Sequence, residues 1–221
     1  RQMCIRDRAN IISLMIKSSS RIGYDYQRAR DLQWLISNKK IHTAGKHVLD
    51  TMLDFIQPLG MTTHTKRWDI PLSEESLSFA EIYSRNKVPT VIISPCSSDR
   101  YLNYRNWSVE NFQIIIKFLI EKYDCKVILT GGGSKNEKLY GKRLTENSNI
   151  INLIGKTSLK QLCAIIDKAD LVICPDSGPA HIATAFNTCV IGLYASSNPA
   201  RTGPYNSLKL TVNCYPEAVR K

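Results

Sequence analysis

The 221-residue chain lacks any apolar run long enough to span a bilayer. Its beginning does not read as a secretory signal either, because Arg6, Asp7 and Arg8 interrupt any apolar core there. Among its seven cysteines no pair has the C-x-x-C spacing, and most lie within or beside apolar segments. We therefore expect reduced, buried thiols rather than disulfides. The histidines have no ligand-like spacing, so no metal site is expected. Because neither a membrane-spanning run nor a secretory signal is recognised, the protein is predicted to be cytoplasmic.

A complete dinucleotide-binding fingerprint is also missing. The segment TGGGS, residues 130–134, follows an expected strand, but Asn136 replaces the third glycine of G-x-G-x-x-G. The acidic residue expected about 20 residues further on is absent too, because residues 151–155 read INLIG. A NAD-dependent dehydrogenase is therefore disfavoured. We interpret Gly131 and its neighbours as a glycine-lined wall beside a nucleotide, with a flexible turn as the structural alternative.

The net charge of +11 favours an anionic partner, which could be a nucleic acid, an acidic membrane surface or a phosphorylated substrate. Residues 1–50 hold ten Lys and Arg against four Asp and Glu. A solvated basic face without any partner is the alternative. The basic and aromatic residues between Arg100 and Trp107 form only a short, isolated run, so we expect no nucleic-acid partner.

The chain is organised in three segments. Residues 1–8, RQMCIRDR, have no periodicity, and we interpret them as a non-native scar outside the fold. Residues 9–88 are expected to be helical with little strand, as the remainder of an N-terminal domain and its linker. Residues 89–221 alternate strands with helices, which predicts an α/β domain with a parallel sheet and helices on both faces.

Hydrophobic periodicity and capping residues give the boundaries of the expected elements. Before residue 89 we expect a helix over about 9–17, a strand over Arg21–Tyr24, a helix over His47–Ile56, an extended segment over Trp68–Leu72, and a helix from Glu74 to about Arg85 with Ser73 as its cap. After it we expect strands over Thr90–Ser94, Lys126–Thr130, Ile150–Leu153, Leu171–Cys174 and Val190–Tyr194, with Leu208–Val212 as a candidate sixth, and helices over Val109–Tyr123, Lys135–Glu146, Leu159–Lys168 and Pro179–Phe186.

The turn PDSGPAH, residues 175–181, carries the most specific chemistry of the sequence. Asp176 or Ser177 can cap the following helix, and Pro179 suits its first position. Gly178 leaves the backbone open to a ligand, so N–H groups and the positive end of the helix dipole converge on a spot that suits a phosphate. His181, in the first turn, can donate to a phosphate or a sugar hydroxyl. The structural alternatives are a capping role for Asp176 and a satisfied structural role for His181.

Two further groups of residues are expected at the same edge of the sheet. Ser97 and Ser98 add small hydroxyl side chains after the first strand of the α/β domain. Arg105 could bring a planar, cationic donor to a diphosphate, although a surface arginine is the alternative.

The segment PDSGPAHIATAFNTCVIGLYASSNPARTGPY resembles the donor-site region of family 9 glycosyltransferases, the ADP-heptose:lipopolysaccharide heptosyltransferases. The segment RNWS, which begins at Arg105, is similar to the basic-x-Trp-Pro element of that family, with Ser in place of Pro. TGG at Thr130 and GKTSL at Gly155 resemble its nucleotide-side loops, and RIGY and HVLD resemble the close of its N-terminal domain. The resemblance extends over nearly all of residues 9–205.

This resemblance implies a GT-B fold, in which two Rossmann-like domains face a cleft, and a monomer that transfers heptose from ADP-heptose to the lipopolysaccharide inner core. Transfer would proceed with inversion and without a metal or other cofactor, at the cytoplasmic face of the inner membrane. The resemblance places Gly178, Pro179 and His181 at the diphosphate end, Asp176 and Ser177 nearer the heptose, Ser97 and Ser98 near the phosphates, Thr157 near the adenine, and Arg105, Gly131, Lys156 and Arg201 among the further donor-side candidates.

The resemblance also implies that the general base is an acidic residue near the start of the N-terminal domain, to which no residue of this sequence corresponds. We therefore expect a chain truncated at both ends that binds the donor weakly and does not catalyse transfer. The alternatives are a related GT-B transferase with another nucleotide sugar, and a non-catalytic module that binds anions or nucleic acid.

Overall fold

The computed structural model describes residues 5–29, 32–42, 45–61, 65–84, 88–97, 104–145 and 150–220. It forms two compact units that divide between Lys66 and Arg67. We expected residues 9–88 to comprise the remainder of an N-terminal domain together with its linker. Residues 67–88 group with the larger unit because Ala80, on helix α4 (Glu74–Ser84), is 1% exposed within the core of that unit.

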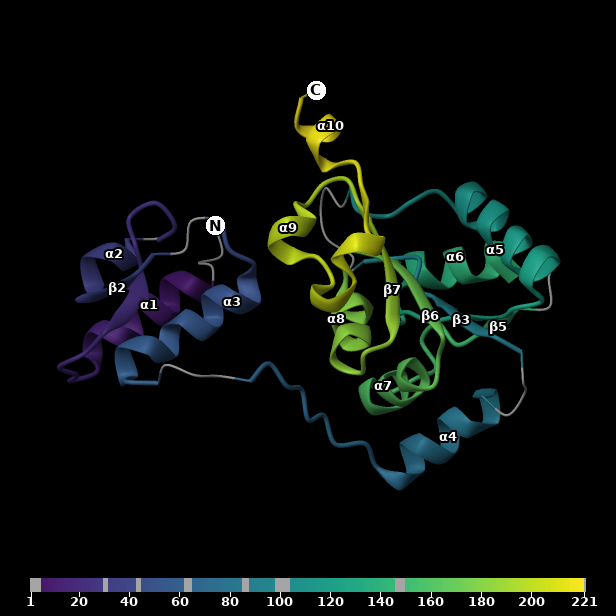
Figure 1. Cartoon of the computed structure of the whole chain (residues 1–221), viewed down its shortest axis with the longest axis horizontal. Coiled ribbons are helices and arrows are strands. Elements are labelled where there is room, and N and C mark those ends of the chain that lie inside the picture. Colours follow the sequence, from purple (N-terminus) through teal and green to yellow (C-terminus); the bar gives the residue numbers. More distant parts are fainter. Residues whose placement is uncertain are drawn as a thin grey trace. The chain divides into compact units, whose positions relative to one another are not determined.

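The larger unit is built on one six-stranded sheet in which every strand pair is parallel (Figure 1). The strand order is β5-β4-β3-β6-β7-β8. The chain first builds outward from β3 to β5, then returns to the other side of β3 and builds outward again. The strands are β3 (Thr90–Ile93), β4 (Lys126–Leu129), β5 (Ile151–Asn152), β6 (Leu171–Pro175), β7 (Cys189–Tyr194) and β8 (Val212–Asn213).

The reversal of strand order occurs between β3 and β6, which pair with Ile92 opposite Val172. Loops that leave two such strands in opposite directions open a crevice at their carboxyl ends, and open α/β sheets bind ligands there. The expected Rossmann-like architecture is thus confirmed, and the topology identifies the edge of the sheet at which a site would form.

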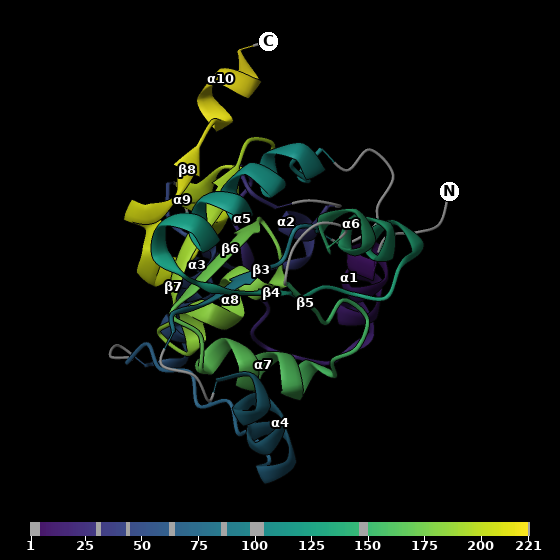
Figure 2. The same cartoon turned by 90° about the vertical axis from the view of Figure 1, so that its right-hand side faces the viewer.

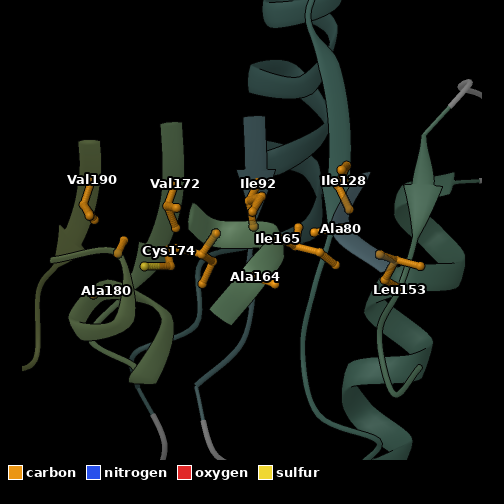
Figure 3. Packing of buried hydrophobic residues seen from close by; sticks show 12 residues of the cluster. Ala80, Ile92, Ile128, Leu153, Ala164, Ile165, Val172, Cys174, Ala180 and Val190 are labelled. Carbon is orange, nitrogen blue, oxygen red and sulfur yellow. The ribbon is translucent and has the colours of Figure 1, made fainter. Parts of the chain in front are cut away.

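Both faces of the sheet are covered by helices, as predicted (Figure 2). Helices α4, α7 (Leu159–Asp167) and α8 (Gly178–Ala185) cover one face, and helices α5 (Val109–Tyr123) and α6 (Lys135–Thr145) cover the other. Figure 3 shows side chains of four neighbouring strands that point toward the first group of helices, and the residues are Val190, Val172, Ile92 and Ile128. Alternate residues of the same strands face the second group, so the apolar strands are buried on both sides.

Serine side chains begin several helices of this unit. Ser108 accepts a hydrogen bond from the N–H of Asn111 at the start of α5, and Ser158 forms a complete capping box with Gln161 at the start of α7. Ser73 accepts from the N–H of Ser76, as expected for the start of α4.

The smaller unit contains a second, two-stranded parallel sheet, in which β1 (Ile22–Tyr24) pairs with β2 (Lys39–Ile41). Strand β1 was expected, whereas β2 was not, because a charged Lys-Lys-Ile segment carries little strand signal. The helices of this unit are α1 (Ile5–Met15), α2 (Gln33–Ile36), α3 (Val48–Leu53) and the 3₁₀ helix η1 (Asp54–Leu59). Helix α1 begins inside the eight-residue segment that we had set apart from the fold.

The candidate strand over Leu208–Val212 is wrong in its position. Residues Tyr205–Leu210 form a 3₁₀ helix, η2, and the strand is Val212–Asn213. Ser207 explains the difference, because its N–H donates to the carbonyl of Pro204 and its hydroxyl accepts from the N–H of Val190. The apolar alternation of the segment indicated a strand, but these turn hydrogen bonds decide its conformation. The short helices α9 (Pro199–Thr202) and α10 (Tyr215–Val219) were not predicted.

Among the described helices none is both long and apolar enough to cross a membrane.

Two phenylalanines on helix α5 test the core. Phe112 is fully buried and Phe118 is 48% exposed. Because Phe112→Ala leaves a cavity on one face of the sheet, we expect it to lower the free energy of unfolding by about 3–5 kcal/mol. Phe118→Ala, the matched control on the same helix, should cost less than about 1 kcal/mol. Urea unfolding monitored by circular dichroism measures both, and equal losses would contradict the core described here.

Candidate functional site

The predicted donor-side residues all belong to the larger unit, and they follow the carboxyl ends of five neighbouring strands. In spatial order, Lys156 and Thr157 follow β5, Gly131 follows β4, Ser97 and Arg105 follow β3, residues 176–181 follow β6, and Arg201 follows β7. Ser98 lies outside the described residues. The parallel sheet therefore gathers these separate motifs along one edge.

Helix α8 begins without the side-chain cap that we expected. Its N-cap residue, Ser177, makes no side-chain capping hydrogen bond, and its hydroxyl donates to the carbonyl of Pro175 at 3.1 Å instead. A Cβ atom added to Gly178 would meet nothing within 4 Å. The start of the helix is therefore open, and its dipole and N–H groups favour an anion there.

Arg105 and Asp176 lie side by side next to this helix start. The Nε of Arg105 is 3.8 Å from Oδ2 of Asp176, and its Nη1 donates to the backbone carbonyl of Asp176 at 3.5 Å. The Arg105 side chain is 37% exposed and that of Asp176 is 12% exposed. Arg105 is thus not a simple surface arginine, because its guanidinium extends over the β6–α8 turn.

Asn106 holds the segment with Arg105 against the end of β3. Its Oδ1 accepts hydrogen bonds from the N–H of Ser97 at 2.8 Å and from the Ser97 hydroxyl at 3.3 Å. Sequence reasoning missed Asn106, because a single polar residue between Arg105 and Trp107 carries no recognisable pattern. The effect of the contact is to fix the cation next to the switch point.

His181 lies in the first turn of α8 with an exposed side chain. The exposure of the ring leaves it accessible to a ligand at the start of the helix. Pro179 is in the first turn of the same helix, as predicted.

The glycine loop after β4 is closed by a carboxylate of the protein itself. Glu137 accepts from the N–H of Gly132 at 2.7 Å, and from the N–H and hydroxyl of Ser134 at 3.2 and 2.7 Å. Ser134 in turn accepts from the N–H of Glu137, which completes a capping box at the start of α6. A carboxylate thus occupies the position in which a phosphate would sit in a phosphate-binding loop.

This loop is tied to the neighbouring loop after β5. The N–H of Gly155 donates to the carbonyl of Gly131 at 3.1 Å, and Gly155 has a positive φ of 71°. Lys156 donates to the carbonyl of Asn152 at 2.9 Å, and Thr157 is half-buried beyond it. The contacts favour a fixed wall over the flexible turn that we had kept as an alternative.

Two buried groups lie beneath the site. Burial raises the pKa of the Cys174 thiol to about 12, and the Asp176 carboxylate adds to this effect. Burial also raises the pKa of Tyr194 strongly, with a further contribution from Asp176. Both groups are therefore neutral near pH 7, and the charges near them are those of Asp176 and Arg105.

Arg201 is exposed on α9, at the same edge of the sheet. The described residues contain no group of three or more His, Cys, Asp or Glu side chains that could hold a metal ion. A cavity of about 780 Å³ lies at the opposite, amino edge, where Val88, Lys126 and Ile151 line it, so it does not belong to this site.

Fold and site together define an open, parallel α/β sheet of Rossmann-like type, with an uncapped helix start beside its switch point. The family model of glycosyltransferase family 9 (heptosyltransferase) matches residues 8–220, and the chain belongs to this family. The resemblance noted in the sequence is thereby confirmed.

The lipopolysaccharide core heptosyltransferase OpsX of Haemophilus influenzae is 38% identical over 97% of this chain. This alignment covers 61% of the relative, so the chain spans about three fifths of the length of that protein.

Among solved structures, a family 9 glycosyltransferase from Veillonella parvula matches 94% of the chain and 59% of its own length, with a TM-score of 0.74 at 21% identity. The Escherichia coli heptosyltransferase WaaC with ADP matches 87% of the chain and 58% of its own length, with a TM-score of 0.63 at 22% identity. These likenesses confirm the expected GT-B type of fold.

Cysteine alkylation tests the burial of Cys174 beneath the site, with the exposed Cys189 for comparison. Because burial raises the pKa of Cys174, this thiol should stay unmodified when the folded protein is treated with iodoacetamide at pH 8, while the exposed Cys189 is alkylated. Raising the pH to 9.5 should still leave Cys174 unmodified, because its pKa of about 12 keeps the thiol protonated. Peptide mass spectrometry gives the extent at each residue, and rapid labelling of Cys174 without unfolding would contradict its placement.

Proposed function

We propose that this chain carries the donor site of a heptosyltransferase that transfers heptose from ADP-heptose to the inner core of lipopolysaccharide. The observation that carries the proposal is the Arg105 guanidinium beside the open start of α8, at the switch point of a parallel sheet. The family and the heptosyltransferase names of the relatives support it.

The order of the loops supports an extended nucleotide along the sheet edge. Neighbouring strands are about 4.8 Å apart, so the path from β5 to β6 is about 14 Å long. Because Glu137 already occupies the anion position of the glycine loop, a diphosphate is better placed at α8, and the nucleoside at Gly131 and Thr157. We accordingly assign Ser97, Arg105, Gly178, Pro179 and His181 to the diphosphate, and Asp176 and Ser177 to the sugar. Lys156 and Arg201 are kept as flanking candidates.

The chemistry of this arrangement fits departure of ADP. As the acceptor oxygen attacks the anomeric carbon from the opposite side, the bond from that carbon to the diphosphate breaks, and negative charge develops on the leaving phosphate. The N–H groups at the start of α8 and the Arg105 guanidinium stabilise this charge, so we propose a reaction without a metal. Attack from the side opposite the leaving group makes the proposed reaction inverting. A base positioned at the acceptor removes the proton of its hydroxyl, and we assign that role to no residue of this chain.

The acceptor is proposed to be lipopolysaccharide core at the cytoplasmic face of the inner membrane. The excess of basic residues, with a net charge of +11, supports approach to a phosphorylated acceptor on an anionic surface. We also propose that the protein acts as a monomer.

Arg105→Ala tests the proposal. Loss of a charge-assisted contact to the diphosphate should weaken ADP binding about 10- to 100-fold, measured by isothermal titration calorimetry. Arg143→Ala is the matched control, because Arg143 forms a surface ion pair with Glu110 on α5 and should leave ADP binding unchanged.

The same titrations separate the competing functions. Equal affinity for ADP, UDP and GDP would contradict the choice of nucleotide. Failure of ADP to bind, together with salt-sensitive oligonucleotide binding that survives Arg105→Ala, would contradict the donor site altogether.

A further inference from the structure

We propose that Tyr194 is a positioning residue that fixes the Asp176 carboxylate toward the sugar of the nucleotide-sugar donor and links it to the loop of α9. This inference rests on the proposed donor site and assigns a role to a residue that the sequence motifs did not single out. Tyr194 is the last residue of β7 and is 2% exposed.

Strand register brings the two side chains together. In the pairing of β6 with β7, Cys174 lies opposite Gly192 and Pro175 lies opposite Leu193. The next pair in this register is Asp176 with Tyr194, so the two residues are neighbours across adjacent strands and point to the same face of the sheet.

Gly192 provides the space that the tyrosine ring occupies. A Cβ atom at this position would lie 2.7 Å from Cε2 and 3.2 Å from Cδ2 of Tyr194, and 3.5 Å from Cδ of Pro204. The ring therefore lies back along its own strand over Gly192. A side chain at position 192 would displace the ring, and with it the hydroxyl.

The Tyr194 hydroxyl has two acceptors within reach. It is 3.2 Å from the backbone carbonyl of Thr202 on α9, and it also interacts with the Asp176 carboxylate. A phenol has a single proton to donate, and this proton can be shared between the two acceptors or pass from one to the other. The hydroxyl thus connects the β6–α8 turn to the segment that follows β7.

The arrangement assigns different roles to the two partners of Asp176. Arg105 is more than a third exposed and has a flexible side chain, so it can turn toward a diphosphate when the donor binds. Tyr194 is buried and cannot follow it. Among the described residues, Tyr194 would then continue to hold the Asp176 carboxylate in its orientation toward a sugar hydroxyl.

Tyr194→Phe tests this role, because it removes only the hydroxyl. Calorimetry with ADP and with ADP-heptose measures how much the sugar adds to binding. We expect ADP affinity to stay within about two-fold and the additional affinity from heptose to fall about ten-fold, as for loss of one hydrogen bond to a charged group. Thr188→Val is the matched control: it removes another buried hydroxyl that donates to a backbone carbonyl, that of Ile166, at the amino edge of the sheet.

A purely structural role for Tyr194 predicts a different result, in which ADP and ADP-heptose lose affinity equally, and this would overturn the proposal. Unchanged binding of both ligands would overturn it as well.

A ligand-free measurement separates this proposal from the donor assignment. In protein labelled with ¹³C at aspartate carboxyl groups, the Asp176 signal is identified by its loss in Asp176→Asn. We expect it to shift in Tyr194→Phe and not in Thr188→Val, and an unmoved signal would overturn the contact itself. Failure of ADP to bind the unaltered chain would instead overturn the donor site, and with it the role of Tyr194 toward a sugar.

Discussion

The pairing of β3 with β6 is the constraint on which the rest of the larger unit depends. These strands are about 80 residues apart in the sequence, and the carboxylate of Asp170 helps to join them by accepting from the N–H of Thr90 at 2.8 Å. The N–H of Ser94 donates to the carbonyl of Ile173 at 3.0 Å, at the end of the same pair. Strands β4 and β5 extend from one side of this pair, and β7 and β8 extend from the other. The pair therefore determines where the crevice lies along the edge of the sheet. Arg105 reaches Asp176 only because the loops that carry them leave adjacent strands.

The polar contacts at the crevice form a chain that crosses the strands. Ser97 is tied to Asn106, the neighbouring Arg105 contacts Asp176, and Asp176 in turn interacts with Tyr194. Ser97 and Asn106 both lie in the segment after β3, whereas the contacts of Asp176 with Arg105 and with Tyr194 join different strands of the sheet. The site therefore depends on the arrangement of the sheet and not on any single motif. The apolar core beneath these links supports them, since Val172 and Ile92 are fully buried under the same loops.

The alternation of strands and helices after residue 89 was predictable because parallel strands read as short apolar runs and helices as amphipathic periods. The position of the turn at Ser177 was predictable, but the hydrogen bonding of its hydroxyl was not. The sequence does not distinguish a serine that caps the helix from one that donates to the carbonyl of Pro175. Asn106 and Tyr194 could not be predicted as members of the site, because their roles depend on partners that are distant in the chain or lie across a strand pair. The contact of Glu137 with Ser134 could have been predicted, because the S-x-x-E pattern that begins at Ser134 is a known signal for the start of a helix.

The carboxylate of Glu137 has a consequence for the thermodynamics of ligand binding. Glycine-rich loops lose much conformational entropy when they are ordered, and in many proteins the arriving ligand has to supply that free energy. Here the Glu137 carboxylate accepts from the backbone N–H groups of Gly132 and Ser134. The protein's own contacts therefore order this loop. At the donor site that we propose, the ligand would not have to supply that free energy, and a larger share of it would remain available at the diphosphate.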